Sequence, residues 1–241
     1  MRISIITITY NSEKTIERAI KSVINQDFPD KEYIIIDGGS TDNTLNIIEK
    51  YKDKIDYFIS EKDKGISDAF NKGISAATGD YIGILNSDDE LYPNVLSQIA
   101  PYCRGNVDVL RGTQISYNTA TGEECVLEPT KNFNKVPFRF HVCHMATYIS
   151  KNAFEKYGNY RLDFRIAMDL ELLYRMHNKG ASIKYMDVCV GKFYTGGIST
   201  TDLKRKRQEV AMVYTLNGAN PVQAYMFKLL LSVKDFVKHV I

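Results

Sequence analysis

Residues 33–42 read Tyr-Ile-Ile-Ile-Asp-Gly-Gly-Ser-Thr-Asp, an apolar run that ends at Asp37 and passes into a glycine-rich polar turn. A short run of β-branched residues bounded by a turn is typical of a strand buried inside a sheet. Residues 2–9 before this stretch, and residues 55–59 and 81–85 after it, repeat the pattern. The first part of the chain therefore predicts four buried strands.

Segments with helical spacing separate these strands. Apolar residues recur every three or four positions between residues 16 and 24, after the capping residues Asn11 and Ser12, and the spacing returns at 45–51 and 66–77. Strands that alternate with helices across short turns predict right-handed crossovers and a parallel sheet covered on both faces. We expect an α/β fold: a single Rossmann-like domain with a mixed, mainly parallel central sheet of about seven strands.

The second half of the chain is less regular. Residues 107–117 and 124–127 predict two strands around a turn at Thr121 and Gly122, and residues 145–150 predict another strand. Helical spacing is found in three further segments: 166–177, 203–216 and 222–240.

Polar residues gather where the strands of the first half end. They form three groups: Thr9-Tyr10-Asn11, Asp37-Gly38-Gly39 and Asn86-Ser87-Asp88-Asp89. Ligands of parallel α/β sheets bind outside the carboxyl ends of the strands. We therefore expect the three groups to form one binding site at one edge of the sheet.

Composition excludes several classes of protein. The chain has 241 residues, of which 44% are hydrophobic and 25% charged, as in a water-soluble domain with one core. Its net charge of +2 is too small to indicate a nucleic acid partner. The four cysteines form no CxxC pair, and no apolar run approaches the roughly 20 residues that cross a bilayer. We expect a cytoplasmic protein, without a zinc site or disulfide framework, which is either free or peripheral on the inner face of the plasma membrane.

Asp88 and Asp89 are adjacent carboxylates at a predicted strand end. Their mutual repulsion is offset by a bound cation, and Mg²⁺ or Mn²⁺ prefers such oxygens together with substrate phosphates. The alternative is a solvated turn in which Asp89 and Glu90 cap a helix after Pro93.

Asp37 and Tyr10 are candidates for contact with a nucleobase. A carboxylate can accept from the N–H groups of a base, and a tyrosine ring can stack on it. The alternatives are a turn-forming aspartate and a core aromatic. The residues Gly38-Gly39-Ser40 do not complete the GxGxxG pattern, which makes a dinucleotide site the weaker interpretation.

Three segments carry a resemblance to a known family. Residues 5–11 read Ile-Ile-Thr-Ile-Thr-Tyr-Asn, residues 34–44 read Ile-Ile-Ile-Asp-Gly-Gly-Ser-Thr-Asp-Asn-Thr, and residues 65–91 contain Asp-Ala-Phe-Asn-Lys-Gly, Thr-Gly-Asp-Tyr and Asn-Ser-Asp-Asp in that order. Over roughly the first hundred residues this order resembles family 2 glycosyltransferases with the GT-A fold, of the type that acts in bacterial polysaccharide and cell-envelope biosynthesis.

The resemblance implies a nucleotide-sugar donor, with UDP favoured by Asp37 and with GDP and dTDP left open. It assigns the nucleobase to Thr9, Tyr10 and Asp37, and the ribose and diphosphate to the segment from Asp68 to Lys72. It makes Ser87, Asp88 and Asp89 the counterpart of the Asp-x-Asp motif, in which Ser87 and Asp88 bind the nucleotide and Asp88 and Asp89 bind the divalent metal.

The resemblance also implies that Asp169 is the catalytic base. Residues 164–173 read Phe-Arg-Ile-Ala-Met-Asp-Leu-Glu-Leu-Leu and are similar to the family's Glu-Asp-x-x-Leu segment. An inverting transfer needs one carboxylate to take the proton of the acceptor hydroxyl. The alternative is that Asp169 and Glu171 only complement the dipole of a helix. The chain departs from the family pattern at Asn86 and Met168, where acidic residues are usual, and it has no histidine in residues 192–200.

His144 resembles the family's acceptor-side histidine, which predicts contact with a saccharide or lipid-linked acceptor. A single histidine is more often structural. His141 lies three residues earlier, but no acidic residue adjoins the two in sequence, so zinc is not expected.

The C-terminal residues leave three alternatives open. Residues 204–207 read Lys-Arg-Lys-Arg, and residues 222–241 combine apolar residues with Lys228, Lys234 and Lys238. Such helices lie on anionic membrane surfaces, pack on their own domain, or pack against a second subunit in a homodimer.

We therefore expect a GT-A catalytic domain over residues 1–202, with a donor half (1–100) and an acceptor half (101–202), followed by a helical extension over 203–241. Two rivals remain. An inactive nucleotide- or carbohydrate-binding module is favoured by Asn86 and Met168. A nucleotidyltransferase would share a metal site at a sheet edge, but the expected basic glycine-rich loop is missing after the first strand.

Overall fold

The computed structural model describes residues 1–133, 140–197 and 202–218. Its central sheet has nine strands in the order β3-β2-β1-β4-β8-β6-β9-β5, with β7 paired to β6. The strands are β1 (Ile3–Thr9), β2 (Lys31–Asp37), β3 (Tyr57–Ser60), β4 (Tyr81–Asn86), β5 (Glu90–Leu91), β6 (Val109–Tyr117), β7 (Glu124–Leu127), β8 (Thr147–Ser150) and β9 (Ile183–Tyr194). The helices are α1 (Ile16–Ile24), α2 (Thr44–Glu49), α3 (Ile66–Ala76), α4 (Val95–Ile99), α5 (Lys151–Tyr157), α6 (Met168–Asn178) and α8 (Leu203–Leu216).

The sheet is mixed and mainly parallel, as the sequence predicts. Strands β3, β2, β1 and β4 are mutually parallel, β8 is antiparallel to both β4 and β6, and β9 runs parallel to β6. The register places Thr9 beside Asp37 and Ile8 beside Asn86. The carboxyl ends of β2, β1 and β4 therefore meet at one edge, where the polar groups are expected.

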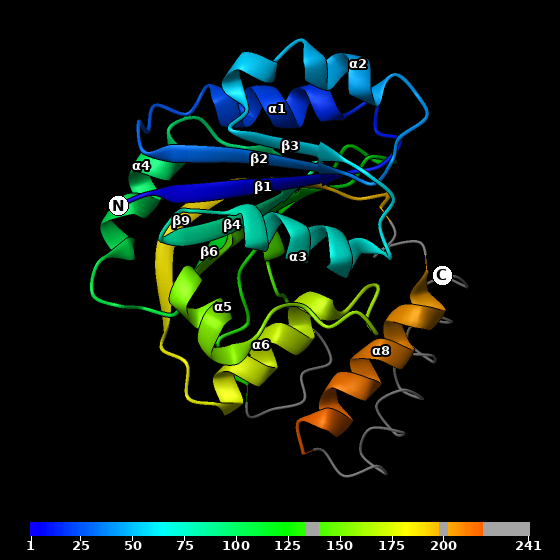
Figure 1. Ribbon diagram of the computed structural model, residues 1–241. Coiled ribbons are helices and arrows are strands. Elements are labelled where there is room, and N and C mark those ends of the chain that lie inside the picture. The colour runs from blue at the N-terminus through cyan, green and yellow to red at the C-terminus, as the bar shows by residue number, and fades with distance from the viewer. Residues whose placement is uncertain (134–139, 198–201, 219–241) are drawn as a thin grey trace.

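Helices cover both faces of this sheet (Figure 1), and alternate residues of β1 point to opposite cores. Ile5 belongs to the core beneath α1, α2 and α4, while its neighbour Ile6 belongs to the core beneath α3, α5 and α6. This two-sided burial explains why the central strands read as continuous apolar runs.

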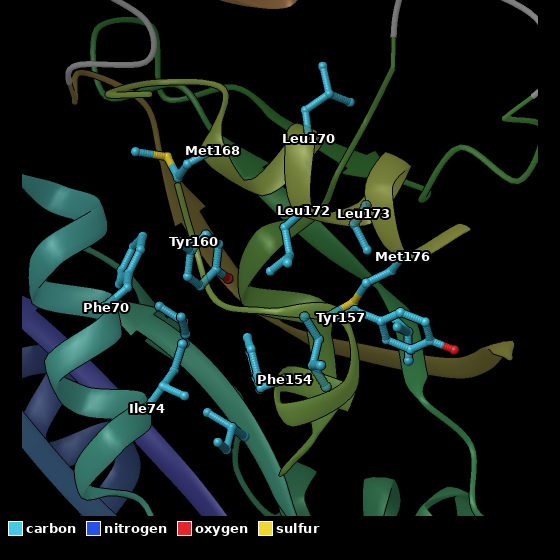
Figure 2. Close-up of a cluster of buried hydrophobic side chains, with 14 of the residues drawn as sticks. Phe70, Ile74, Phe154, Tyr157, Tyr160, Met168, Leu170, Leu172, Leu173 and Met176 are labelled. Carbon is cyan, nitrogen blue, oxygen red and sulfur yellow. The ribbon is translucent and has the colours of Figure 1, made fainter. Parts of the chain in front are cut away.

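The second core joins the two halves of the chain. Figure 2 shows Phe70 and Ile74 of α3 facing Phe154 and the apolar residues of α6, with Tyr160 between Phe70 and the α6 segment. The ring centroids of Phe70 and Tyr160 are 5.1 Å apart. The same core includes Val213 and Tyr214 of α8, so this helix packs on the remainder of the fold. Residues 222–240 are outside the described residues, and the helix expected there stays a prediction.

Several element boundaries differ from those that the sequence predicts. The first helix begins at Ile16 because Ser12 N–H donates to Thr44 Oγ1 (2.8 Å) and Asn11 has a positive φ of 48°, so that Asn11 and Ser12 form a turn. Three elements are not anticipated from the sequence: β5, α5 and β9. The alternative that Asp89 and Glu90 form a solvated turn capping the helix after Pro93 is wrong, because Asp89 is buried, Glu90 pairs with Lys192 of β9, and the N-cap residue of α4 is Asn94.

Candidate active site

Asp89 lies in the turn between β4 and β5 and is fully buried. Its Oδ1 accepts from Tyr194 N–H at 3.0 Å, and its Oδ2 accepts from Asn86 Nδ2 at 3.3 Å. Burial and the neighbouring charge of Asp88 raise the pKa of Asp89 well above its usual range. Both carboxylate oxygens are thus used to tie β4 to the end of β9.

Asp88 is half-buried beside Asp89, and burial raises its pKa, although Arg18 opposes that shift. The Arg18 guanidinium donates to the backbone carbonyl of Asp88 and lies 3.8 Å from the ring centroid of Tyr194. A Cβ atom placed on Gly197 would lie 3.4 Å from Asp88 Oδ2, so the chain after β9 passes close to this carboxylate. A desolvated carboxylate in this setting is suited to a cation.

The described residues contain no cluster of three or more histidine, cysteine, aspartate or glutamate side chains that could hold a metal ion by themselves. Asp88 fits a divalent ion that takes its other ligands from a diphosphate. Asp89 fits less well as a direct ligand, because its two oxygens are already hydrogen-bonded within the protein.

Ser87 connects this strand end to the loop after β1. Its hydroxyl is 2.9 Å from that of Ser12, and Ser87 itself is nearly buried. Thr9, at the end of β1, is also buried, and its Oγ1 has no hydrogen-bond partner among the described residues. The Ser12 and Ser87 hydroxyls thus link two strand ends of this edge, while Thr9 Oγ1 is enclosed by protein.

Tyr10, Gly38 and Asp63 form a corner beside these strand ends. Tyr10 is 62% exposed, which excludes the alternative that it is a core aromatic. A Cβ atom on Gly38 would lie 2.9 Å from Asp63 Oδ2 and 3.5 Å from Tyr10 Cδ2. The absence of a side chain at Gly38 therefore leaves space between an exposed aromatic ring and a carboxylate oxygen.

Asp37 is fully buried beneath this corner. Its Oδ2 accepts from Gly39 N–H (3.0 Å), Ser40 N–H (2.9 Å) and Ser60 Oγ (2.6 Å), while Oδ1 accepts from Ser40 Oγ (2.5 Å). The carboxylate therefore stabilises the turn after β2, which is the turn-forming role given above as the alternative for Asp37. Neither oxygen of Asp37 is exposed at the surface.

Lys72 is held by three acidic side chains. Its Nζ lies 2.6 Å from Asp63 Oδ1, 2.8 Å from Glu61 Oε1 and 3.6 Å from Asp68 Oδ2. Burial opposes the charged form of Lys72, but the hydrogen bonds to Asp63 and Glu61 outweigh it and raise its pKa. The group carries more negative than positive charge, which suits the N–H and O–H donors of a nucleoside better than a phosphate. An open pocket of about 500 Å³ adjoins Asp68 and Lys72 on the side of β3.

Asp169 lies in the first turn of α6 and is partly exposed. Its Oδ1 accepts from Leu170 N–H at 2.7 Å. The preceding segment is tied to α3, because Ser67 Oγ donates to the Phe164 carbonyl at 3.0 Å and Asn71 Nδ2 donates to the Tyr160 carbonyl at 2.8 Å. Helix α3 also carries Asp68, so one helix fixes the Asp169 segment relative to the corner at Asp63.

His144 is brought close to Asp169, although no acidic residue adjoins it in sequence. Its Nε2 lies 2.9 Å from Tyr160 Oη, and its ring packs edge-on against Phe70 at 5.2 Å. Burial lowers the pKa of His144, while the charge of Asp169 acts in the opposite direction. A neutral histidine beside the predicted base is compatible with the acceptor role and with the structural one.

Comparison with known proteins identifies the family of this chain. The family model described as Glycosyl transferase family 2 matches residues 4–158. The chain belongs to glycosyl transferase family 2.

Two curated relatives of this glycosyltransferase illustrate the range of the family. A PGL/p-HBAD biosynthesis glycosyltransferase of Mycobacterium bovis (strain BCG / Pasteur 1173P2) is 28% identical over 213 residues, which cover 82% of this chain and 79% of that protein. A cholesterol galactosyltransferase of Borreliella burgdorferi is 37% identical over 109 residues, which cover 44% of this chain and 30% of that protein.

Solved structures show that the glycosyltransferase has the GT-A fold expected from its sequence. S. aureus TarS 1-349 in complex with UDP-GlcNAc has a TM-score of 0.68 at 19% identity, covering 95% of this chain and 70% of that chain. Mannosyltransferase PcManGT from Pyrobaculum calidifontis, in complex with GDP-Man and Mn²⁺, has a TM-score of 0.70 at 18% identity, covering 97% and 68%. This chain spans 42% of a longer TarS structure.

Three residues of the site in this glycosyltransferase are not identified from sequence: Arg18, Asp63 and Tyr160. Asp63 follows β3 and obeys the same rule that identifies Asp37 and Asp88, so the strand-end pattern could have found it. Arg18 lies on α1 and Tyr160 in the segment between α5 and α6, where nothing in the local sequence indicates a site.

Proposed function

We propose that this glycosyltransferase transfers a sugar, with inversion, from a nucleoside-diphosphate sugar to a hydroxyl of a saccharide or lipid-linked acceptor in polysaccharide or cell-envelope biosynthesis. The observation that supports this most directly is the common edge of the sheet. There, Tyr10, Gly38 and Asp63 form a corner, Asp88 follows strand β4 on the other side of β1, and α3 ties the Asp169 segment to the same region.

The base and ribose of the donor are assigned to the corner. Tyr10 offers its exposed face for stacking, and Asp63 Oδ2 is assigned as the acceptor for an N–H group of the base, while the buried Asp37 holds the turn that forms the corner. Asp68 and Lys72 line the ribose side. We favour UDP because its uracil carries an imide N–H, from which Asp63 Oδ2 beside Gly38 can accept a hydrogen bond.

The diphosphate is assigned to the end of β4, where Ser87 and Asp88 follow the strand. Asp88 would hold Mn²⁺ or Mg²⁺, and Asp89 would hold Asp88 in place through Tyr194 and Asn86. A bound divalent ion supplies positive charge that offsets the charge developing on the leaving diphosphate.

Asp169 is the proposed general base. Its Oδ1 is held by Leu170 N–H, which leaves Oδ2 to accept the proton of the acceptor hydroxyl as that oxygen attacks the anomeric carbon. We assign His144 to the acceptor side, with its Nε2 held at 2.9 Å from the hydroxyl of the buried Tyr160.

Nucleotide titration with two variants tests the assignment. We expect one of UDP, GDP and dTDP to bind in calorimetry with Mn²⁺, and Asp88→Ala to abolish the dependence on metal. Asp169→Asn should keep donor binding and lower turnover by about 10²–10⁴-fold, because general base catalysis contributes about that much. Full turnover by Asp169→Asn would refute the base. Nucleotide binding without turnover in the wild type would instead favour an inactive binding module.

The setting of the protein in the cell is also proposed. Among the described residues we find no helix with the length and hydropathy of a membrane-spanning segment. The basic residues of α8 would bring the enzyme to the inner face of the plasma membrane, where lipid-linked acceptors are available.

A further inference from the structure

Glu209 of α8 is a buried acid that the proposed chemistry does not use. Only 6% of its surface is exposed, and its carboxylate points at the chain immediately before α6. Oε2 accepts from Ile166 N–H at 2.7 Å and Ala167 N–H at 2.9 Å, and both oxygens accept from Arg165 N–H, at 3.0 and 3.1 Å. One side chain thus binds three consecutive backbone N–H groups.

This contact meets a specific need of α6. The N-cap residue of α6 is Ala167, which has no side chain that can accept from the exposed N–H groups of a helix end. Glu209 instead accepts from the N–H of Ala167 itself and from those of the two residues before it, and its negative charge is favourable at a helix N-terminus. Asp169 follows two residues later, and its Oδ1 accepts from Leu170 N–H.

Helix α8 is itself fixed on the fold, so that Glu209 is a stable anchor. The rings of Tyr174 and Tyr214 pack at 5.6 Å, and Asn178 Nδ2 donates to Asn217 Oδ1 at 2.7 Å. Figure 1 shows α8 beside α6, with both helices on the same side of the sheet. Arg205 Nε contacts Glu209 Oε1 at 3.1 Å from the exposed side.

We propose that Glu209 is a positioning residue for Asp169: it holds residues 165–167 so that the first turn of α6 presents the base to the acceptor. This inference rests on the proposed role of Asp169. It makes α8 a part of the catalytic unit, although α8 lies beyond the residues that match the family model.

Side-chain length distinguishes positioning from a simple need for charge. Glu209→Gln retains an oxygen that can take the place of Oε2, whereas Glu209→Asp keeps the charge on a shorter side chain that cannot reach the three N–H groups. We expect kcat to fall only about threefold for Gln, about tenfold for Asp and about 10²-fold for Glu209→Ala, because small displacements of a catalytic group have effects of this order. The KM and Kd of the donor should stay within about twofold of the wild type.

Two control variants separate positioning from stability. Val213→Ala weakens the packing of the same helix without touching the carboxylate, and Arg205→Ala removes only the outer contact; both should keep kcat within about twofold below their melting temperatures. Equal kcat values for Glu209→Asp and Glu209→Gln, or a loss of kcat in Val213→Ala equal to that in Glu209→Ala, would overturn the inference.

Hydrogen exchange and a double variant distinguish failure of this inference from failure of the proposed function. Exchange of the amides of residues 165–170 should be faster in Glu209→Asp than in Val213→Ala, whether or not the base is correctly assigned. Unchanged exchange refutes the anchoring. If Asp169→Asn keeps full turnover, the base is wrong; if it does not, adding Glu209→Ala should lower the residual turnover by less than about twofold, since both changes act through one group.

Discussion

Replacing Lys72 by methionine should weaken binding of the nucleoside part of the donor, with no additional loss of affinity for the diphosphate part. The resemblance to the family assigns Lys72 to the ribose and diphosphate together, but its ammonium is already held by Asp63, Asp68 and Glu61. Methionine keeps most of the length of the side chain and removes the charge. The three carboxylates then repel one another next to Tyr10 and Gly38, and the corner for the base loses its shape.

The expected losses of stability and affinity depend on how exposed each acidic partner of Lys72 is. The Glu61 side chain is 50% exposed, so its pair with Lys72 contributes little, about 0–1 kcal/mol. The Asp63 and Asp68 side chains are only 13% and 20% exposed, and the loss of their shared cation costs more. We expect the free energy of unfolding to fall by about 2 kcal/mol, and the Kd for the nucleoside to rise about tenfold, which corresponds to about 1.4 kcal/mol.

Calorimetry with a matched pair of ligands checks this reasoning. The Kd for UDP and the Kd for uridine should rise by the same factor in Lys72→Met, because the side chain acts on the corner that both ligands share. Lys62→Met is the matched control, since Lys62 is exposed and forms no ion pair among the described residues. If Lys72→Met weakens UDP and leaves uridine unchanged, Lys72 contacts the diphosphate and our interpretation of the acidic group is wrong.

Two further variants test the opposite edge of the sheet and the base corner. Glu32→Gln should lower the free energy of unfolding by about 1–2 kcal/mol near neutral pH, because the buried Glu32 carboxylate accepts from Ser4 Oγ (2.5 Å) and Thr78 N–H (2.8 Å). Burial raises the pKa of Glu32, but these hydrogen bonds outweigh burial and lower the pKa overall. The contribution of Glu32 to stability is therefore fully present above the unfolded pKa of about 4.3, and it is lost as the pH falls through the lower folded pKa. Urea unfolding should therefore show a smaller difference between variant and wild type at a pH of about 3, and a constant difference would contradict this role. Gly38→Ala should raise the Kd for the nucleotide about tenfold with little change in melting temperature, because its Cβ would lie 2.9 Å from Asp63 Oδ2; unchanged affinity would remove the base from this corner.

The strand-end rule explains why part of the site is predictable. Asp37 and Asp88 each follow a run of apolar residues, and parallel strands that pair in register must bring such residues to one edge. The apolar runs themselves arise because helices bury both faces of these strands. Strand β5 is not evident because it has only two residues, whereas the alternation of buried and exposed positions in β9 is a strand signal that we did not recognise in the sequence.

The chain by itself determines the α/β class, the family and the positions of Asp37, Asp88 and Asp169, because these depend on patterns within short segments. Only the tertiary structure decides what each carboxylate contacts. Asp89 accepts a hydrogen bond from Tyr194 N–H of the distant strand β9, and Asp63 is paired with Lys72. The segment before α6 is held by Glu209, which is more than 40 residues away along the chain. Hydrogen bonds of this kind depend on distances of about 3 Å between side chains and backbone from separate elements, and such distances are set by packing of the whole core.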